Sequence, residues 1–176
     1  RMVEANRLSS MILYGPPGIG KTTSAHVIAK ECGFGILELN ASDCRNRKSI
    51  RALLKDTVQS YSMNQCCAEN STPSRKQVII MDEVDGMGSG DRGGIAELIL
   101  VIASTQIPII CICNDRESPK IRSLSKYCYD CAFGKLPKES VVTRLLYICK
   151  KENINLSRDA LSDLVEASNG DMRQVI

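Results

Sequence analysis

Short apolar runs alternate with longer helix-forming stretches over most of the chain. The runs lie at residues 10–14, 35–39, 77–83, 107–113 and 127–133. Continuous apolar runs such as 77–83 and 107–113 are typical of parallel strands that are buried on both faces of a sheet. The pattern therefore predicts an α/β fold with a five-stranded parallel sheet flanked by helices.

The stretches between and after these runs have the period and the capping residues of helices. We expect helices near 21–32, 46–60, 92–104, 138–151 and 157–168, with a further one from Asp171, and a small helix or turn at 120–124. Ser157 is a suitable N-cap, and Gly170 stands just beyond the end of the helix that follows it. We place an α/β domain at 1–134 and a helical domain at 135–176, which is truncated and too short to close a core of its own.

Composition narrows the class of protein only slightly. A net charge of +3 neither requires nor excludes a nucleic-acid partner. Without an apolar run of about 18 residues, we expect no membrane span. The nine cysteines are scattered, which favours free, reduced thiols inside the cell. A zinc site would use Cys111, Cys113, Cys128 and Cys131, but these pairs lie on predicted strands instead of knuckle turns.

The strongest motif lies between the first predicted strand and the first predicted helix. Residues 15–22 fit the phosphate-binding pattern G-x-x-x-x-G-K-[ST]. Its glycines let backbone N–H groups approach phosphate oxygens, and the helix adds its N-terminal dipole. Lys21 can reach the β- and γ-phosphates of a nucleoside triphosphate, while the Thr22 hydroxyl can hold Mg²⁺. The candidate nucleotide-binding residues are Gly15, Pro16, Pro17, Gly18, Ile19, Gly20, Lys21, Thr22 and Thr23.

Polar side chains follow two of the predicted central strands, at the sheet edge where ligands bind in α/β folds. Asp82 and Glu83 end the run at 77–83, and Asn114 follows the run at 107–113. Adjacent residues of a strand point to opposite sides. Asp82 can therefore support Mg²⁺ while Glu83 polarises the attacking water. Asn114 can hydrogen-bond the γ-phosphate or that water, or can simply cap the strand.

Two further surfaces are candidates for binding partners. Around the expected helix at 46–60, four basic residues are candidate DNA contacts, although a solvated basic face is an equal alternative. These residues are Arg45, Arg47, Lys48 and Arg51. The expected helix at 92–104 is apolar almost all round, so it is either fully buried or docks a partner through Leu98 and Val101.

Together these motifs resemble the AAA+ ATPases, specifically the clamp loaders. The stretches 38–43, 81–94 and 109–122 are similar to the large-subunit type of eukaryotic replication factor C, and 170–175 resembles that family's second sensor. The resemblance implies an AAA+ P-loop fold with a helical lid at 135–176. It also implies roles for Asn114 as first sensor and for Arg173, on the lid, as second sensor at the γ-phosphate.

The same resemblance implies partners and a location, and a sliding clamp is then the partner that we expect at Leu98 and Val101. ATP binding and hydrolysis with Mg²⁺ would drive loading of a sliding clamp onto primer–template DNA, in a hetero-pentamer with small clamp-loader subunits in the nucleus. Clamp loaders also have an N-terminal segment around the adenine and a collar beyond the lid. We therefore expect the chain to be part of a longer protein.

One position departs from the small-subunit pattern. Small clamp-loader subunits carry Ser-Arg-Cys before the last strand, and the arginine serves the neighbour's ATP site. The matching stretch here is Lys126-Tyr127-Cys128. Tyrosine cannot stabilise phosphoryl charge as an arginine does. We therefore expect this subunit to receive an arginine finger and not to provide one.

Other functions remain open at this stage. The chain could be an ATP-binding scaffold with little turnover of its own, a small clamp-loader subunit or a branch-migration helicase. A P-loop kinase for a small molecule fits less well, because Asp82, Glu83, Asn114 and Arg173 match a hydrolase site.

Overall fold

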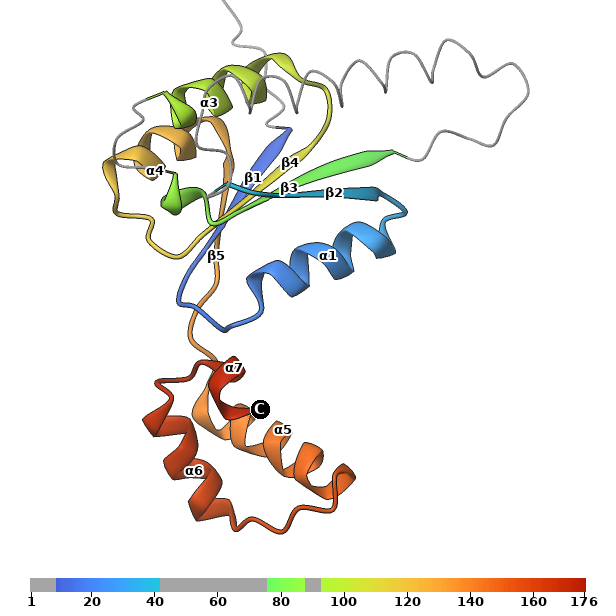
Figure 1. Ribbon diagram of the computed structural model, residues 1–176, viewed down its shortest axis with the longest axis vertical. Helices are drawn as coiled ribbons and strands as arrows, with labels where there is room; N and C mark the ends of the chain where they lie inside the picture. The colour runs from blue at the N-terminus through green and yellow to red at the C-terminus, as the bar shows by residue number, and fades with distance from the viewer. Residues whose placement is uncertain (1–8, 42–75, 88–92) are drawn as a thin grey trace, which may run out of the picture.

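The computed structural model describes residues 9–41, 76–87 and 93–176. A five-stranded sheet in the order β2-β3-β4-β1-β5 lies at the centre (Figure 1). Every neighbouring pair is parallel, which confirms the predicted architecture. The strands are β1 (Ser10–Tyr14), β2 (Gly35–Asn40), β3 (Gln77–Asp82), β4 (Ile109–Cys113) and β5 (Tyr129–Ala132).

Helices cover both faces of the sheet, with α1 on one side and α3 and α4 on the other (Figure 1). A second group, α5 to α7, forms the helical lid. The described helices are α1 (Lys21–Glu31), α3 (Gly94–Ser104), α4 (Pro119–Leu124), α5 (Lys138–Lys151), α6 (Arg158–Ala167) and α7 (Met172–Val175), with 3-10 turns η1 (Val84–Gly86) and η2 (Ser125–Tyr127). The expected helix at 46–60 lies outside the described residues. None of the described helices is long and apolar enough to cross a membrane.

The alternation of side chains along the strands creates two cores. On β3, Ile79 and Met81 join the core beneath α3 and α4, while Val78 and Ile80 join the core beneath α1. β4 is buried at every position, which agrees with the uninterrupted apolar run in the sequence at 107–113. The lid has its own small cluster, in which Val141 and Leu161 are buried between α5 and α6.

The expectation for Leu98 was wrong. Leu98 has no exposed surface and lies in the core between α3 and the sheet, together with Ile95 and Ile102. These three residues are spaced three and four apart and therefore share one helix face. Leu98 cannot form part of an exposed docking surface. Val101 is half-buried, and Leu100 is the leucine of α3 that faces outward, with 55% exposure.

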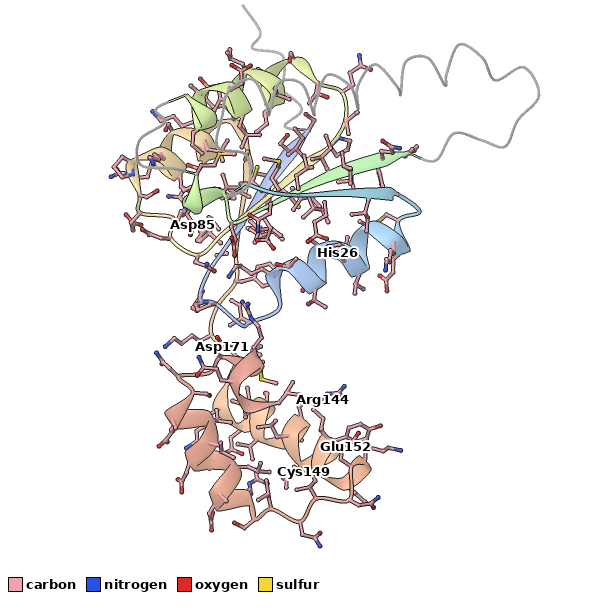
Figure 2. The ribbon with its side chains drawn as sticks, in the orientation of Figure 1. His26, Asp85, Arg144, Cys149, Glu152 and Asp171 are labelled. Atoms are coloured by element: carbon pink, nitrogen blue, oxygen red, sulfur yellow. The ribbon has the colours of Figure 1, made fainter. Side chains whose placement is uncertain are left out.

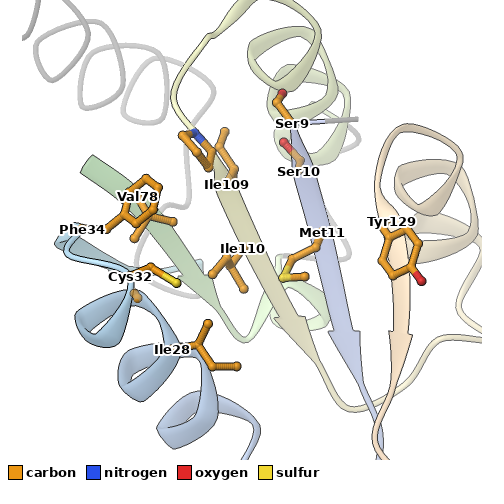
Figure 3. Close-up of a pocket in the computed structure, with 12 residues that line it drawn as sticks. Ser9, Ser10, Met11, Ile28, Cys32, Phe34, Val78, Ile109, Ile110 and Tyr129 are labelled. Carbon is orange, nitrogen blue, oxygen red and sulfur yellow. The ribbon is translucent and has the colours of Figure 1, made fainter. Parts of the chain in front are cut away.

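On the α1 side of the sheet, an apolar cavity of about 590 Å³ opens (Figure 3). Its walls include Met11 of β1, Ile28 of α1, Ile110 of β4 and Tyr129 of β5. This cavity is separate from the phosphate-binding loop described below, because none of the loop residues 15–20 lines it.

The cysteines within the described residues are free. Cys111, Cys113 and Cys128 are buried, and Cys131 is half-buried. In the same part of the chain, no group of three or more potential metal-ligating His, Cys, Asp or Glu side chains occurs.

Candidate nucleotide-binding site

The phosphate-binding loop connects the end of β1 to the start of α1, as the motif predicted. Gly20 precedes α1 with φ of +92°, and no side chain caps the helix N-terminus. The first N–H groups of α1 therefore remain available for an anion. Gly18 has φ of +69°, a conformation that side chains rarely adopt, and it lies directly against the lid.

Lys21 stands at the centre of the site and is 6% exposed. Its ammonium donates hydrogen bonds to Gly15 O at 2.8 Å, Pro16 O at 2.7 Å and Asn114 Oδ1 at 2.8 Å. Burial lowers the pKa of Lys21, and nearby acids such as Asp82 act against that shift. Two oxygen acceptors of the loop and one of Asn114 thus hold this cation, and the same N–H groups can donate to phosphate oxygens instead.

Thr22 and Asp82 meet across the gap between α1 and β3. Thr22 Oγ1 donates to Asp82 Oδ2 at 2.7 Å, and Asp82 Oδ1 accepts from the Glu83 backbone N–H at 2.8 Å. A hydroxyl and a carboxylate side by side are hard oxygen ligands of the kind that Mg²⁺ prefers. The two side chains therefore fit a magnesium ion that is held jointly with phosphate oxygens.

Glu83 has an unusual backbone conformation for a residue with a side chain. Its φ of 55° and ψ of 40° lie in the left-handed region, which costs of order 1–3 kcal/mol and is often found at functional sites. Its carboxylate accepts a hydrogen bond from Asn40 Nδ2 at 3.3 Å. Asn40 ends β2 and pairs in register with Asp82 of β3. The structure therefore adds Asn40 to the predicted site residues.

Asn114 is held through both its side chain and its backbone. While its Oδ1 accepts from Lys21, its backbone N–H donates to Asp85 Oδ2 at 2.9 Å. The same carboxylate oxygen accepts from Asp115 N at 3.2 Å. Sequence reasoning missed Asp85. The only signal for Asp85 in the sequence was its place as a third acidic residue, two positions after Glu83.

The lid closes on the loop from the opposite side. Met172 N donates to Gly18 O at 3.2 Å. Asp171 lies at the top of the lid in Figure 2, and its side chain accepts from Arg173 N at 2.9 Å. The Arg173 side chain is 76% exposed, and its Nε lies 4.0 Å from Asp171 Oδ1. Arg173 therefore stands free enough to turn toward a ligand.

These groups surround one cavity of about 730 Å³. The predicted residues that line it are Gly18, Ile19, Gly20, Lys21, Thr22, Thr23, Asp82, Glu83, Asn114 and Arg173. Strand ends, loop and lid thus bring together cations, amides and carboxylates over a volume suited to a nucleotide. The candidate DNA contacts Arg45, Arg47, Lys48 and Arg51 lie outside the described residues.

Comparison with known proteins divides the chain into two matched parts. Residues 11–129 match the model of the ATPase family associated with various cellular activities (AAA). Residues 138–176 match the RFC1-like AAA+ ATPase lid domain.

Curated relatives match over nearly the whole chain. Replication factor C subunit 1 of Drosophila melanogaster is 47% identical over 94% of this chain, and that of Homo sapiens is 42% identical over 98%. The replication factor C large subunit of Thermofilum pendens is 35% identical over 94%. The chain spans 17%, 15% and 38% of the lengths of these three relatives.

Proposed function

Because this chain belongs to the ATPase family associated with various cellular activities, we propose that it binds ATP with Mg²⁺ between the phosphate-binding loop and the lid, and hydrolyses it. The observation that carries the proposal is the convergence of Lys21, Thr22, Asp82, Glu83 and Asn114 on one cavity. Lys21 and Thr22 are the first residues of α1, directly after the loop, and the other three lie at or just beyond the ends of β3 and β4.

Each residue has a distinct role in this proposal. Lys21 and the first amides of α1 bind the β- and γ-phosphates, and Thr22 and Asp82 hold Mg²⁺, which neutralises charge on the phosphates. Glu83 orients the attacking water and takes its proton. Asn114 and Arg173 contact the γ-phosphate, Asn114 from the sheet and Arg173 from the lid. The ATPase body ends near residue 134, and the lid begins near residue 135.

We further propose that the chain is the ATPase part of a clamp-loader large subunit. Support comes from the RFC1-like lid and from the replication factor C relatives, including eukaryotic subunits 1 at 39–47% identity. In this proposal it works in the nucleus, within a hetero-pentamer with small clamp-loader subunits. The complex opens a sliding clamp and places it on primer–template DNA, which Arg45, Arg47, Lys48 and Arg51 help to hold.

Tyr127 supports the expectation that an arginine finger comes from a neighbour. It lies in η2 with 45% exposure, where small clamp-loader subunits carry an arginine. An arginine finger is worth about 10³ to 10⁵ in rate. We therefore expect slow turnover by the protein alone and much faster turnover in the assembled complex.

The test compares ATP turnover by the full-length protein alone and with small clamp-loader subunits, a sliding clamp and primer–template DNA. Glu83→Gln should bind ATP with unchanged affinity but lose turnover at this site, and Asp163→Asn on the exposed surface of α6 is the matched control. Turnover by the protein alone at the rate of the complex would refute the need for a partner arginine. ATP binding without stimulation by any partner would favour a role as a scaffold.

A further inference from the structure

Asp85 lies where two chain segments of the site meet. It belongs to η1, the turn that follows Glu83, and its carboxylate reaches across to the segment after β4. One oxygen, Oδ2, accepts hydrogen bonds from the backbone N–H groups of Asn114 and Asp115, at 2.9 and 3.2 Å. Figure 2 labels Asp85 at this edge of the sheet.

The pairing between β3 and β4 does not extend to Asn114 and Asp115. β3 pairs with β4 only as far as Met81, opposite Cys111. Beyond this pair, β3 continues only in its pairing with β2, at Asp82, and the next residue, Glu83, has a left-handed backbone conformation. The Asp85 carboxylate provides an acceptor for the two amides at this point. Hydrogen bonds from N–H groups to a charged oxygen are among the stronger ones in proteins.

Two functional side chains depend on this connection. Asn114, fixed through its backbone by Asp85, directs its Oδ1 to Lys21 Nζ at 2.8 Å. On the other side, Gly86 N donates to Glu83 O at 2.8 Å, which closes the turn that carries both Glu83 and Asp85. A displacement of Asn114 is therefore transmitted through Asp85 to the turn that presents Glu83.

We propose that Asp85 is a positioning residue, which joins Asn114 to the Glu83 turn so that contact of Asn114 with the γ-phosphate and placement of Glu83 change together. This inference rests on the proposed ATPase function of the same cavity. Asp85 itself is absent from the cavity lining, so it acts through Asn114 and Glu83 and not on the nucleotide.

A double-mutant cycle in the assembled complex tests the connection. Asp85→Ala should lower kcat by roughly tenfold to a hundredfold, the effect expected when a catalytic group is misplaced by about 1 Å. ATP affinity should change less than about threefold, because the loop and Lys21 remain in place. Adding Asp85→Ala to Asn114→Ala should cost little more than Asn114→Ala alone, since the backbone that Asp85 holds then carries no Asn114 side chain to position. Asp163→Ala on α6 is the control carboxylate.

Two conservative variants separate positioning from charge and from folding. Asp85→Asn keeps an oxygen acceptor and should therefore recover most of the kcat that Asp85→Ala loses. If Asp85 acted only through the effect of its negative charge on Lys21, Asp85→Asn would lose as much kcat as Asp85→Ala. Asp85→Glu keeps the charge but moves the oxygen, so it should lower kcat without loss of ATP binding, even if Asp85→Ala fails to fold.

Additive losses in the double mutant, or a loss of ATP affinity as large as the loss of kcat, would overturn the inference. So would full activity of Asp85→Glu. Absence of ATP binding or turnover in the unmodified complex would instead refute the proposed function. Normal turnover there, lost in Glu83→Gln, leaves the Asp85 variants to decide the inference alone.

Discussion

Replacing Gly18 by alanine should separate the lid from the phosphate-binding loop. A Cβ at Gly18 would lie 1.8 Å from Asp171 Oδ1 and 3.0 Å from Asp171 Cα. The carboxylate could rotate away, but contact with the Cα requires the lid backbone to shift. That shift also breaks the hydrogen bond from Met172 N to Gly18 O.

Two terms set the magnitude. The clash of the new Cβ with the Asp171 backbone destabilises the docked lid by roughly 1 kcal/mol, at the lower end of the range for overpacking. The lost hydrogen bond adds roughly 1 kcal/mol. About 2 kcal/mol in the equilibrium between docked and undocked lid corresponds to roughly a 30-fold shift, since 1.4 kcal/mol is a factor of ten.

Gly33→Ala is the matched control. Gly33 also has a positive φ, +75°, but a Cβ there meets no atom within 4 Å. Both variants should lose similar stability from backbone strain, whereas only Gly18→Ala should increase hydrogen exchange of the backbone amides in the lid segment 169–174. Adding Asp171→Ala removes the colliding carboxylate and should restore part of the protection. Equal lid exchange in Gly18→Ala and Gly33→Ala would refute the reasoning.

Three further predictions follow from the core and the site. Leu98→Ala should lower the free energy of unfolding by about 2–5 kcal/mol in denaturant titrations, because the side chain is fully buried. Leu100 is exposed on the same helix, so Leu100→Ala should change this free energy by less than about 0.5 kcal/mol. Equal losses in the two variants would contradict the burial of Leu98. Asn40→Ala removes a donor to Glu83 and should raise basal kcat by up to about threefold at unchanged KM, whereas a lower kcat would show that Asn40 holds Glu83 in its active position. Burial lowers the pKa of Lys21 below 10.5 in the folded protein, so the unfolded chain holds this proton more tightly. The difference in free energy of unfolding between the unmodified protein and Lys21→Met should therefore rise as the pH increases from the lowered pKa to 10.5. A difference that does not change with pH would contradict this prediction.

The sequence predicted the fold class because parallel strands buried on both faces leave uninterrupted apolar runs. It also predicted that Asp82, Glu83 and Asn114 lie close together, since the carboxyl ends of parallel strands share one edge of the sheet. It could not give the strand order, which depends on long-range pairing. That order places Asn40 opposite Asp82 and thereby beside Glu83.

The errors have similar physical causes. α3 is apolar on nearly every side, so the sequence did not show which face meets the sheet, and Leu98 was placed on the wrong one. Asp85 looked like one more acid in a turn, because its two amide partners lie 29 and 30 residues away in the chain. The close approach of Asp171 to Gly18 likewise joins the lid to the first loop.

The central claim is that the cavity beside Lys21 binds ATP together with Mg²⁺. Isothermal titration of ATP into the full-length protein, with and without Mg²⁺, tests it directly. We predict one site whose affinity increases with Mg²⁺, is abolished in Lys21→Met and is retained in Glu83→Gln. Absence of binding, or binding that survives Lys21→Met, would contradict the account.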